Sequence, residues 1–412
     1  MNESHMNLYR LGTSFVISPD HEPGLEMLRP ESAEKHSDRI YCINSRLSPQ
    51  DRMQFRINDA GQYQMASEGV SVLNRNEPTE WMPPWLQYAI LEGRVVSING
   101  SHEDWKERII QPVPKQWRIH AVGLGDVGGI LLTGLKLLGS KDIRRIGIYD
   151  PGEDRIQRWL RELGQICWPF EPESDIPVEA VAPDKLFDCD LFVFCASKGV
   201  PPLESGLKDV RNVQFEGNAA ILAPYVKMAC EAKFRGLFAI VSDPVDHLSR
   251  FVLQESARNG GWLKPEQVRG YGLGVMNGRA MWYAAQNPQF SEYCKEGRAY
   301  GPHGKGLIIA NSIKRFSEEK SDVLTELTEN ANHEVRNAGF KPYVAPALSS
   351  GAISLLKTIR GEWHYSAVSL GGVFMGCCNR FVDGIQETEV LSMPEKLMER
   401  LQETWNLLEK PL

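Results

Sequence analysis

The chain has 412 residues, of which 42% are hydrophobic and 24% charged, and its formal net charge is −7. This length allows two or three domains with sizeable cores, and the composition is typical of a globular protein in water. The acidic balance argues against a nucleic-acid partner, and the lack of any apolar run of about 18 residues argues against a membrane span.

Eight cysteines are scattered along the sequence without a C-x-x-C pair or a cluster with histidine. We therefore expect free thiols in a cytoplasmic protein and no metal site. The opening segment MNESHMNLYRLG lacks the basic and apolar stretches of a secretory signal, which agrees with that location.

Residues 1–115 are rich in polar and turn residues, with short strand-like pieces at 14–17 and 94–98. The sequence indicates no function for this segment. We expect a small extra N-terminal domain that packs on the body of the protein or on a partner subunit.

The stretch 117–150 predicts a strand (118–122), a glycine turn, a helix (127–138) and a second strand (143–149) that ends on Asp150. Gly123, Gly125 and Gly128 have the G-x-G-x-x-G spacing. The first allows the tight turn, the second lets the backbone approach a pyrophosphate, and the third brings the helix close to the strand. The free N–H groups of the helix would then meet the phosphates.

Asp150 follows Gly128 by 22 residues, where a carboxylate can accept both ribose hydroxyls and repel a 2′-phosphate. The pattern therefore predicts binding of NAD rather than NADP. A purely structural turn in a doubly wound fold that has lost its ligand is the alternative.

Strands and helices continue to alternate after this unit, which predicts a parallel sheet with right-handed crossovers and ligands at the carboxyl ends of its strands. The expected elements are a helix at 152–163, strands at 178–181 and 191–195, a helix at 218–232 and a strand at 237–241. The second half predicts helices at 243–256, 274–286, 318–337, 347–359 and 394–408, with a strand at 365–374.

Four motifs occur in a specific order: the glycine turn ending on Asp150, VSDPVD (241–246), GLGVMNGR (272–279) and GPHG (301–304), followed by PYVAPA (342–347). From about residue 117 onward this series resembles the lactate/malate dehydrogenase family. The resemblance implies an α/β fold with a doubly wound parallel-sheet Rossmann domain that binds NAD (116–247), followed by an α+β catalytic domain (248–412). It also implies a small-molecule substrate and a homodimer or homotetramer.

The resemblance assigns His303 of the GPHG motif as the proton donor and acceptor, a role that suits histidine because it titrates near neutral pH. Asn218 matches the family's asparagine near the nicotinamide and substrate, although an asparagine that opens a helix is also a common N-cap.

Two positions depart from the family pattern. Asp243 stands where the family has asparagine, and Asn277 stands where the family has the aspartate that orients the histidine. One hypothesis is that Asp243 orients or charges His303, and another is that it accepts an amine or an extra hydroxyl of the substrate.

The family's arginine that binds the substrate carboxylate has no direct equivalent, because position 280 is alanine and Arg279 lies one residue early. The loop after Ala196 also lacks the family's paired arginines and offers Lys198, Lys208 and Arg211 instead. Without the arginine fork that recognises carboxylates, lactate and malate are doubtful substrates.

The sequence thus favours an NAD-dependent oxidoreductase that acts on a secondary alcohol or ketone, with His303, Asp243 and Asn277 as catalytic candidates. Arg279, Asn218 and Arg211 are candidates for binding the substrate. An inactive NAD-binding or scaffolding protein is the first alternative. An NAD-dependent glycosidase, whose family shares this fold, is the second and less favoured one, because no cysteine–histidine pair for a metal is evident.

Overall fold

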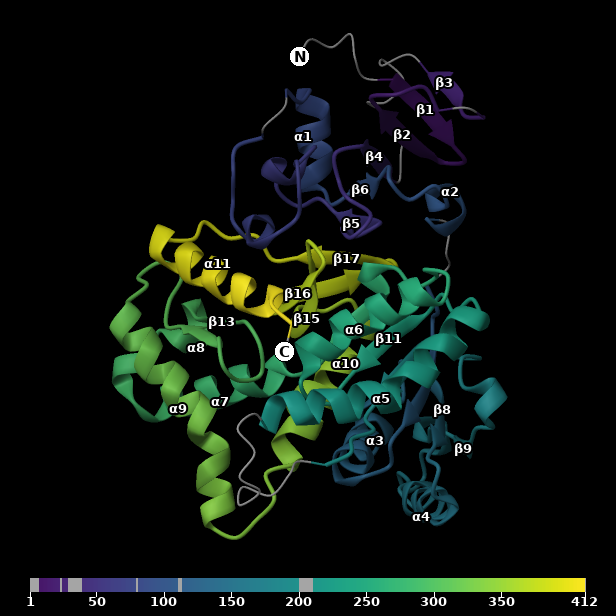
Figure 1. The fold of residues 1–412 in the computed structure, drawn as a ribbon, viewed down its shortest axis with the longest axis vertical. Helices are drawn as coiled ribbons and strands as arrows, with labels where there is room; N and C mark the ends of the chain where they lie inside the picture. Colours follow the sequence, from purple (N-terminus) through teal and green to yellow (C-terminus); the bar gives the residue numbers. More distant parts are fainter. Residues whose placement is uncertain are drawn as a thin grey trace.

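The computed structural model describes residues 7–22, 24–28, 39–78, 81–109, 113–199 and 210–411, and for residues 210 and 211 the backbone only. Figure 1 shows the N-terminal strands lying on top of a larger α/β body. The main sheets are a six-stranded sheet in the order β3-β1-β2-β4-β6-β5 and a nine-stranded sheet in the order β17-β16-β15-β12-β11-β10-β7-β8-β9.

The N-terminal sheet mixes parallel and antiparallel pairs, since β2, β4 and β6 run parallel while β1 and β5 run antiparallel to their neighbours. The strand pieces expected at 14–17 and 94–98 are confirmed. The elements of this part are β1 (Asn7–Leu11), β2 (Ser14–Ser18), β3 (Glu26–Leu28), β4 (Ile40–Asn44), β5 (Gln54–Arg56), α1 (Pro84–Leu91), β6 (Val95–Asn99) and α2 (Trp105–Arg108).

This N-terminal part shares its core with the body. Leu73 and Leu86 belong to the same buried cluster as Leu397 and Leu401 of the closing helix α11 (Glu395–Glu409). The two parts are also joined by a parallel bridge between residues 74 and 391. Of the two placements expected for the extension, packing on the body is therefore observed in this chain.

The parallel part of the large sheet places β7 at its centre, with β8 and β9 on one side and β10, β11 and β12 on the other. This order is that of a doubly wound dinucleotide-binding fold, whose switch point lies between β7 and β10. Its elements are β7 (Trp117–Val122), α3 (Asp126–Leu138), β8 (Ile143–Tyr149), α4 (Glu153–Gly164), β9 (Val178–Ala180), β10 (Leu191–Phe194), α5 (Val210–Glu231), β11 (Leu237–Ile240), α6 (Val245–Arg258) and β12 (Val268–Gly270). The parallel pairing continues past residue 247 into β12, and the domain boundary at 247 stays a prediction.

The second half extends the same sheet by three antiparallel strands, β15 (His364–Leu370), β16 (Val373–Val382) and β17 (Ile385–Thr388). The single strand expected at 365–374 is wrong, because Gly371 and Gly372 adopt φ of 70° and 79° and reverse the chain into a hairpin.

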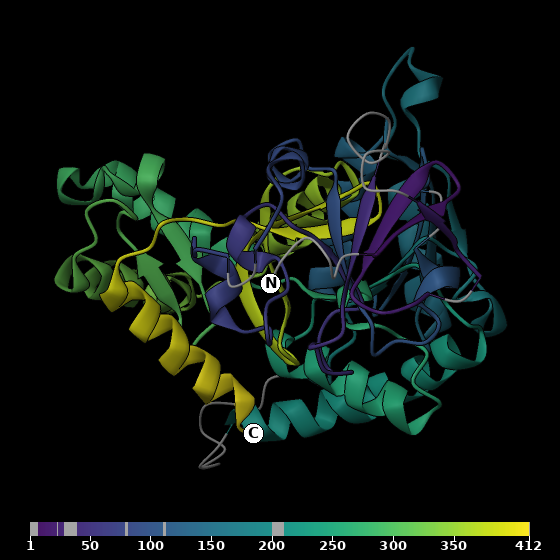
Figure 2. The ribbon, with the colours of Figure 1, turned by 90° about the horizontal axis from the view of Figure 1, so that it is seen from above.

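Most of the remaining elements form a lobe beside the sheet, which Figure 2 shows from above. They are α7 (Leu273–Gln286), α8 (Tyr293–Glu296), β13 (Arg298–Tyr300), β14 (Ile308–Ala310) and α9 (Glu318–Asn337). The π-helical segment Pro346–Ile353 and α10 (Ser354–Ile359) instead pack on the large sheet beside α3. Within the described ranges, no helix combines the length and apolarity that crossing a membrane requires.

His364 at the start of β15 is a buried, hydrogen-bonded histidine. Its Nδ1 lies 3.0 Å from the carbonyl of Glu362, and its Nε2 lies 2.9 Å from the hydroxyl of Thr358. Because a carbonyl only accepts, Nδ1 carries the hydrogen of this bond. Burial lowers the pKa of His364 to about 3.

We expect this burial to make the free energy of unfolding depend on pH. Below the ordinary histidine pKa of about 6.5 the unfolded chain binds a proton that the folded ring does not, so stability falls by roughly 1.4 kcal/mol per pH unit from this group. Chemical denaturation between about pH 6.5 and pH 4 should show a shallower slope for His364→Gln than for the wild type. The exposed His333→Gln serves as the control, and an unchanged slope in His364→Gln would contradict the assignment.

Candidate active site

The turn between β7 and α3 has the geometry of a phosphate cradle. Gly123 has a φ of 90°, and a Cβ on it would overlap the backbone of Ala196 after β10. A Cβ on Gly128 would overlap the carbonyl of Gly123, so this glycine lets α3 lie against the strand end. By contrast, a Cβ on Gly125 would meet nothing within 4 Å. Two glycines thus serve close packing, and the third faces the open space where a pyrophosphate can approach the helix N-terminus.

Asp150 at the end of β8 is buried and holds this turn. One carboxylate oxygen accepts the N–H of Leu124 at 2.9 Å, and the other accepts the N–H of Gly152 at 2.9 Å. Arg155 lies 3.3 Å from the second oxygen. A carboxylate accepts up to about four hydrogen bonds, and three are in place, so Asp150 retains capacity for about one ribose hydroxyl. The residues present therefore fit a dinucleotide.

Two further charged residues lie at this turn. Asp126, the first residue of α3, pairs with Lys341 at 3.1 Å. Lys341 comes from the segment after α9, so the second half of the chain reaches the glycine turn. Sequence reasoning missed this lysine, although it immediately precedes the PYVAPA motif.

His303 lies in the turn between β13 and β14 and faces Asp243, which lies three residues past the end of β11. The Nδ1 atom of His303 is 3.3 Å from Oδ1 of Asp243. A Cβ on Gly272 would lie 3.1 Å from the Cβ of His303, so the glycine before α7 makes room for the histidine. Both side chains remain partly accessible, at 18% for His303 and 42% for Asp243. This contact leaves Nε2 of the ring for another partner.

Asn218 is fully buried and ties together the loops that follow β10 and β11. Its Oδ1 accepts the N–H of Lys198 at 2.9 Å, and its Nδ2 donates to the carbonyl of Asp243 at 2.7 Å. The hydroxyl of Ser242 reinforces the link by donating to the carbonyl of Ala196. The N-cap interpretation of Asn218 is wrong, because α5 begins eight residues earlier at Val210.

Asn277 and Arg279 lie on α7. The side chain of Asn277 contacts α8, and that of Arg279 contacts α9. Asn277 accepts a hydrogen bond from Tyr293 at 2.9 Å, and across the described residues it makes none with His303. Arg279 donates to Asn332 of α9. Burial lowers the pKa of Arg279, while Tyr283 and Asp243 act against that shift, so the guanidinium is within electrostatic reach of Asp243.

Asn332 lies 53 residues from Arg279, and no sequence pattern signalled the contact. The proposed substrate-binding side chains of Lys208 and Arg211 lie outside the described residues. The eight cysteines are free thiols. Across the described ranges, no group of three or more histidine, cysteine, aspartate or glutamate side chains is arranged to hold a metal ion.

Comparison with known proteins supports the resemblance seen in the motifs. No family model matches the chain. L-lactate dehydrogenase 2 of Staphylococcus aureus is 25% identical over 253 residues, which cover 58% of this chain and 74% of that protein. The relatives are dehydrogenases, which agrees with the expected class of activity.

Solved structures establish the same fold. The malate dehydrogenase from Aeropyrum pernix matches with a TM-score of 0.59 at 15% identity, over 71% of this chain and 96% of that chain. The minor L-lactate dehydrogenase from Enterococcus mundtii gives 0.57 at 18% identity, over 72% and 97%. The malate dehydrogenase from Archaeoglobus fulgidus, solved with NADH, gives 0.56 at 18% identity, over 71% and 97%.

These structures are covered almost completely, while more than a quarter of this chain stays unmatched. In motif order, sequence and fold, the chain is thus similar to lactate and malate dehydrogenases, as a divergent member of that family would be.

Proposed function

We propose that the chain is an NAD-dependent dehydrogenase that interconverts a secondary alcohol and a ketone in a small molecule, with His303 as the acid and base. The observation that carries this proposal is the contact between His303 and Asp243, at 3.3 Å, close to the carboxyl edge of the parallel sheet. Ligands of doubly wound folds gather at this edge.

The chemistry follows from which ring nitrogen faces the carboxylate. Asp243 accepts the Nδ1 hydrogen of His303, so the neutral ring has its lone pair on Nε2. That nitrogen can take the proton of a substrate hydroxyl, and the adjacent carboxylate stabilises the imidazolium that results. In the opposite direction, the protonated ring gives the proton back to a carbonyl oxygen. A bound nicotinamide accepts or supplies the hydride at the same carbon.

This arrangement supplies a carboxylate beside the histidine although the family aspartate is absent at position 277. The carboxylate that faces the histidine comes from Asp243, and Asn218 fixes the Asp243 backbone by its hydrogen bond. The contact favours a working acid–base pair over an inactive scaffold, because a decayed site has no reason to keep a carboxylate on His303.

The cofactor would be held by the turn from Gly123 to Gly128, with Asp150 on the adenosine ribose. Arg155 lies 3.3 Å from one oxygen of Asp150, and its side chain is the more exposed of the two. We propose NAD as the physiological cofactor because a 2′-phosphate would meet this carboxylate.

The substrate is proposed to resemble a 2-hydroxy acid without being lactate or malate. Arg279 is the anion-binding candidate on α7, but its guanidinium already donates to Asn332, and Asp243 brings a negative charge close by. A substrate carboxylate would therefore not meet the open arginine fork that recognises carboxylates in lactate and malate enzymes. A homodimer or homotetramer in the cytoplasm completes the proposal.

We expect His303→Gln to lower turnover by roughly 10²–10⁴-fold, because an amide cannot exchange a proton at neutral pH. Asp243→Asn should lower turnover by at least about tenfold, because the imidazolium loses its counter-charge. Both variants should keep the affinity for NADH. Consumption of NADH with a panel of 2-keto compounds is the measurement, and Asp322→Asn on the exposed face of α9 is the control. Full turnover in His303→Gln would show that His303 is not the acid and base of the reaction.

For the cofactor, we expect Asp150→Ala to weaken NADH binding by roughly 10–100-fold, which corresponds to one or two charge-assisted hydrogen bonds. The affinity for NADPH should change less, because the variant also loses a repulsion and leaves Arg155 without its acidic partner. Fluorescence titration with both nucleotides measures the ratio, with Asp154→Ala on exposed α4 surface as the matched control. Equal losses for both nucleotides would refute the role of Asp150 in selecting NAD.

A further inference from the structure

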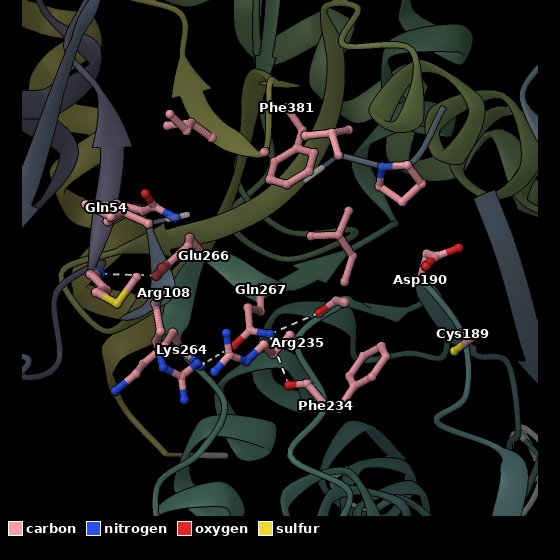
Figure 3. Close-up of a pocket in the computed structure, with 18 of the residues that line it drawn as sticks. Gln54, Arg108, Cys189, Asp190, Phe234, Arg235, Lys264, Glu266, Gln267 and Phe381 are labelled. Carbon is pink, nitrogen blue, oxygen red and sulfur yellow. Dashed lines mark hydrogen bonds between the residues drawn. The ribbon is translucent and has the colours of Figure 1, made fainter. Parts of the chain in front are cut away.

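A second cavity lies at the junction between the N-terminal part and the large sheet, and we call it the junction cavity. Its volume is about 300 Å³, which falls within the range of small-molecule sites. Trp117 and Leu237, which open β7 and β11, line it together with Gln267 just before β12. It therefore lies at the amino ends of the parallel strands, the edge opposite the glycine turn. Figure 3 shows Gln54 of the N-terminal part and Phe381 of β16 facing it from above.

The apolar walls of the junction cavity combine aliphatic side chains with four aromatic rings. Phe187, Phe234, Phe381 and Trp117 line it. The rings of Phe187 and Phe234 pack edge to face with centroids 5.2 Å apart. Such walls suit a flat ring or a short apolar chain.

The acidic side chains of the junction cavity are already engaged. Asp190 accepts the backbone N–H of Arg118 at 2.7 Å, and Asp383 pairs with Arg56 at 3.1 Å. Glu266 accepts the N–H of Met53 at 3.1 Å, and burial raises its pKa.

The basic side chains of the junction cavity differ in whether a carboxylate pairs with them. Arg108 and Lys264 both pair with Asp104. Lys233 and Arg235 form no ion pair within the described part of the chain. They instead flank the Trp262 ring, with their cationic groups 5.6 and 5.7 Å from its centroid. Arg235 additionally donates to the carbonyl of Glu107 at 3.3 Å, which fixes it beside the N-terminal part. Two exposed basic side chains that no carboxylate pairs with, within the described part of the chain, therefore lie at one side of the cavity.

Lys233 also occupies a costly backbone position. It ends α5 in the left-handed region with a φ of 49°. The bonds from Lys233 N–H to the Cys230 carbonyl and from Phe234 N–H to the Ala229 carbonyl form a Schellman motif, in which this position normally carries glycine.

We propose that the junction cavity binds a small organic anion, with the acidic group held by Lys233 and Arg235 and an apolar ring or chain lying against Phe187, Phe234 and Phe381. The ligand is an aryl or alkyl carboxylate or phosphate ester. It bridges the extension and the sheet, which gives the N-terminal part a binding role separate from the cofactor site.

Calorimetric titration of the full-length protein with phenyl phosphate, benzoate and uncharged benzyl alcohol tests this site. We expect both anions to bind, the alcohol to bind at least about tenfold more weakly, and Lys233→Gly to lose at least about tenfold in affinity for the anions. Lys233→Gly should also raise the melting temperature of the ligand-free protein, because glycine adopts the left-handed backbone freely. Loss of binding in this variant therefore cannot be attributed to unfolding.

Arg235→Gln should lower the affinity of the protein for the same anions. Lys227→Gln, which removes an exposed lysine of α5, should leave that affinity unchanged. Equal affinity of the anions for wild type and Lys233→Gly, benzyl alcohol binding as tightly as benzoate, or failure of both anions to bind would each overturn the proposal. NADH titration of Lys233→Gly separates the two sites, because its affinity should equal that of the wild type.

Discussion

The close approach of α3 to the ends of β7 and β10 is the constraint on which the cofactor side of the molecule depends. Only hydrogen at Gly123 and Gly128 permits it, since a Cβ at either position would enter neighbouring backbone. The same approach aims the N-terminus of α3 at open space and brings the Leu124 N–H to Asp150. One steric condition therefore shapes the phosphate cradle and places the ribose acceptor beside it.

The substrate side depends on a hydrogen bond rather than on a steric fit. Asn218 joins the loops after β10 and β11 and holds the backbone of Asp243, whose carboxylate faces His303. A buried amide that satisfies two backbone groups is difficult to replace, because either group would lose its partner. This arrangement explains how a carboxylate at position 243 can face the histidine although the family aspartate is absent at position 277.

Local signals predicted much of this architecture. The glycine spacing and the acid after the next strand indicated the dinucleotide fold, and strand–helix alternation indicated the parallel sheet. The short strands β12 and β17 gave no such signal, because their sequences VRG and IQET lack the apolar run that marks β10 and β11. The Gly371–Gly372 reversal was hidden inside an apolar run that reads equally well as one strand.

Contacts between distant segments were beyond sequence reasoning. The pairing of His303 with Asp243 spans 60 residues and was proposed only because the family motifs place both near the substrate. The Lys341–Asp126 pair spans 215 residues, and no motif connects its members. The shared core of the extension and α11 was similarly hidden, since polar turns interrupt the periodicity of the first 115 residues.

The central claim is that one cleft brings a bound dinucleotide and His303 together. A crystal structure of the protein with NADH tests it most directly. We predict the adenosine ribose on Asp150, the pyrophosphate over Gly125, and the nicotinamide ring facing Nε2 of His303 with room for a small substrate between them. NADH bound elsewhere, or a nicotinamide turned away from His303, would contradict the account.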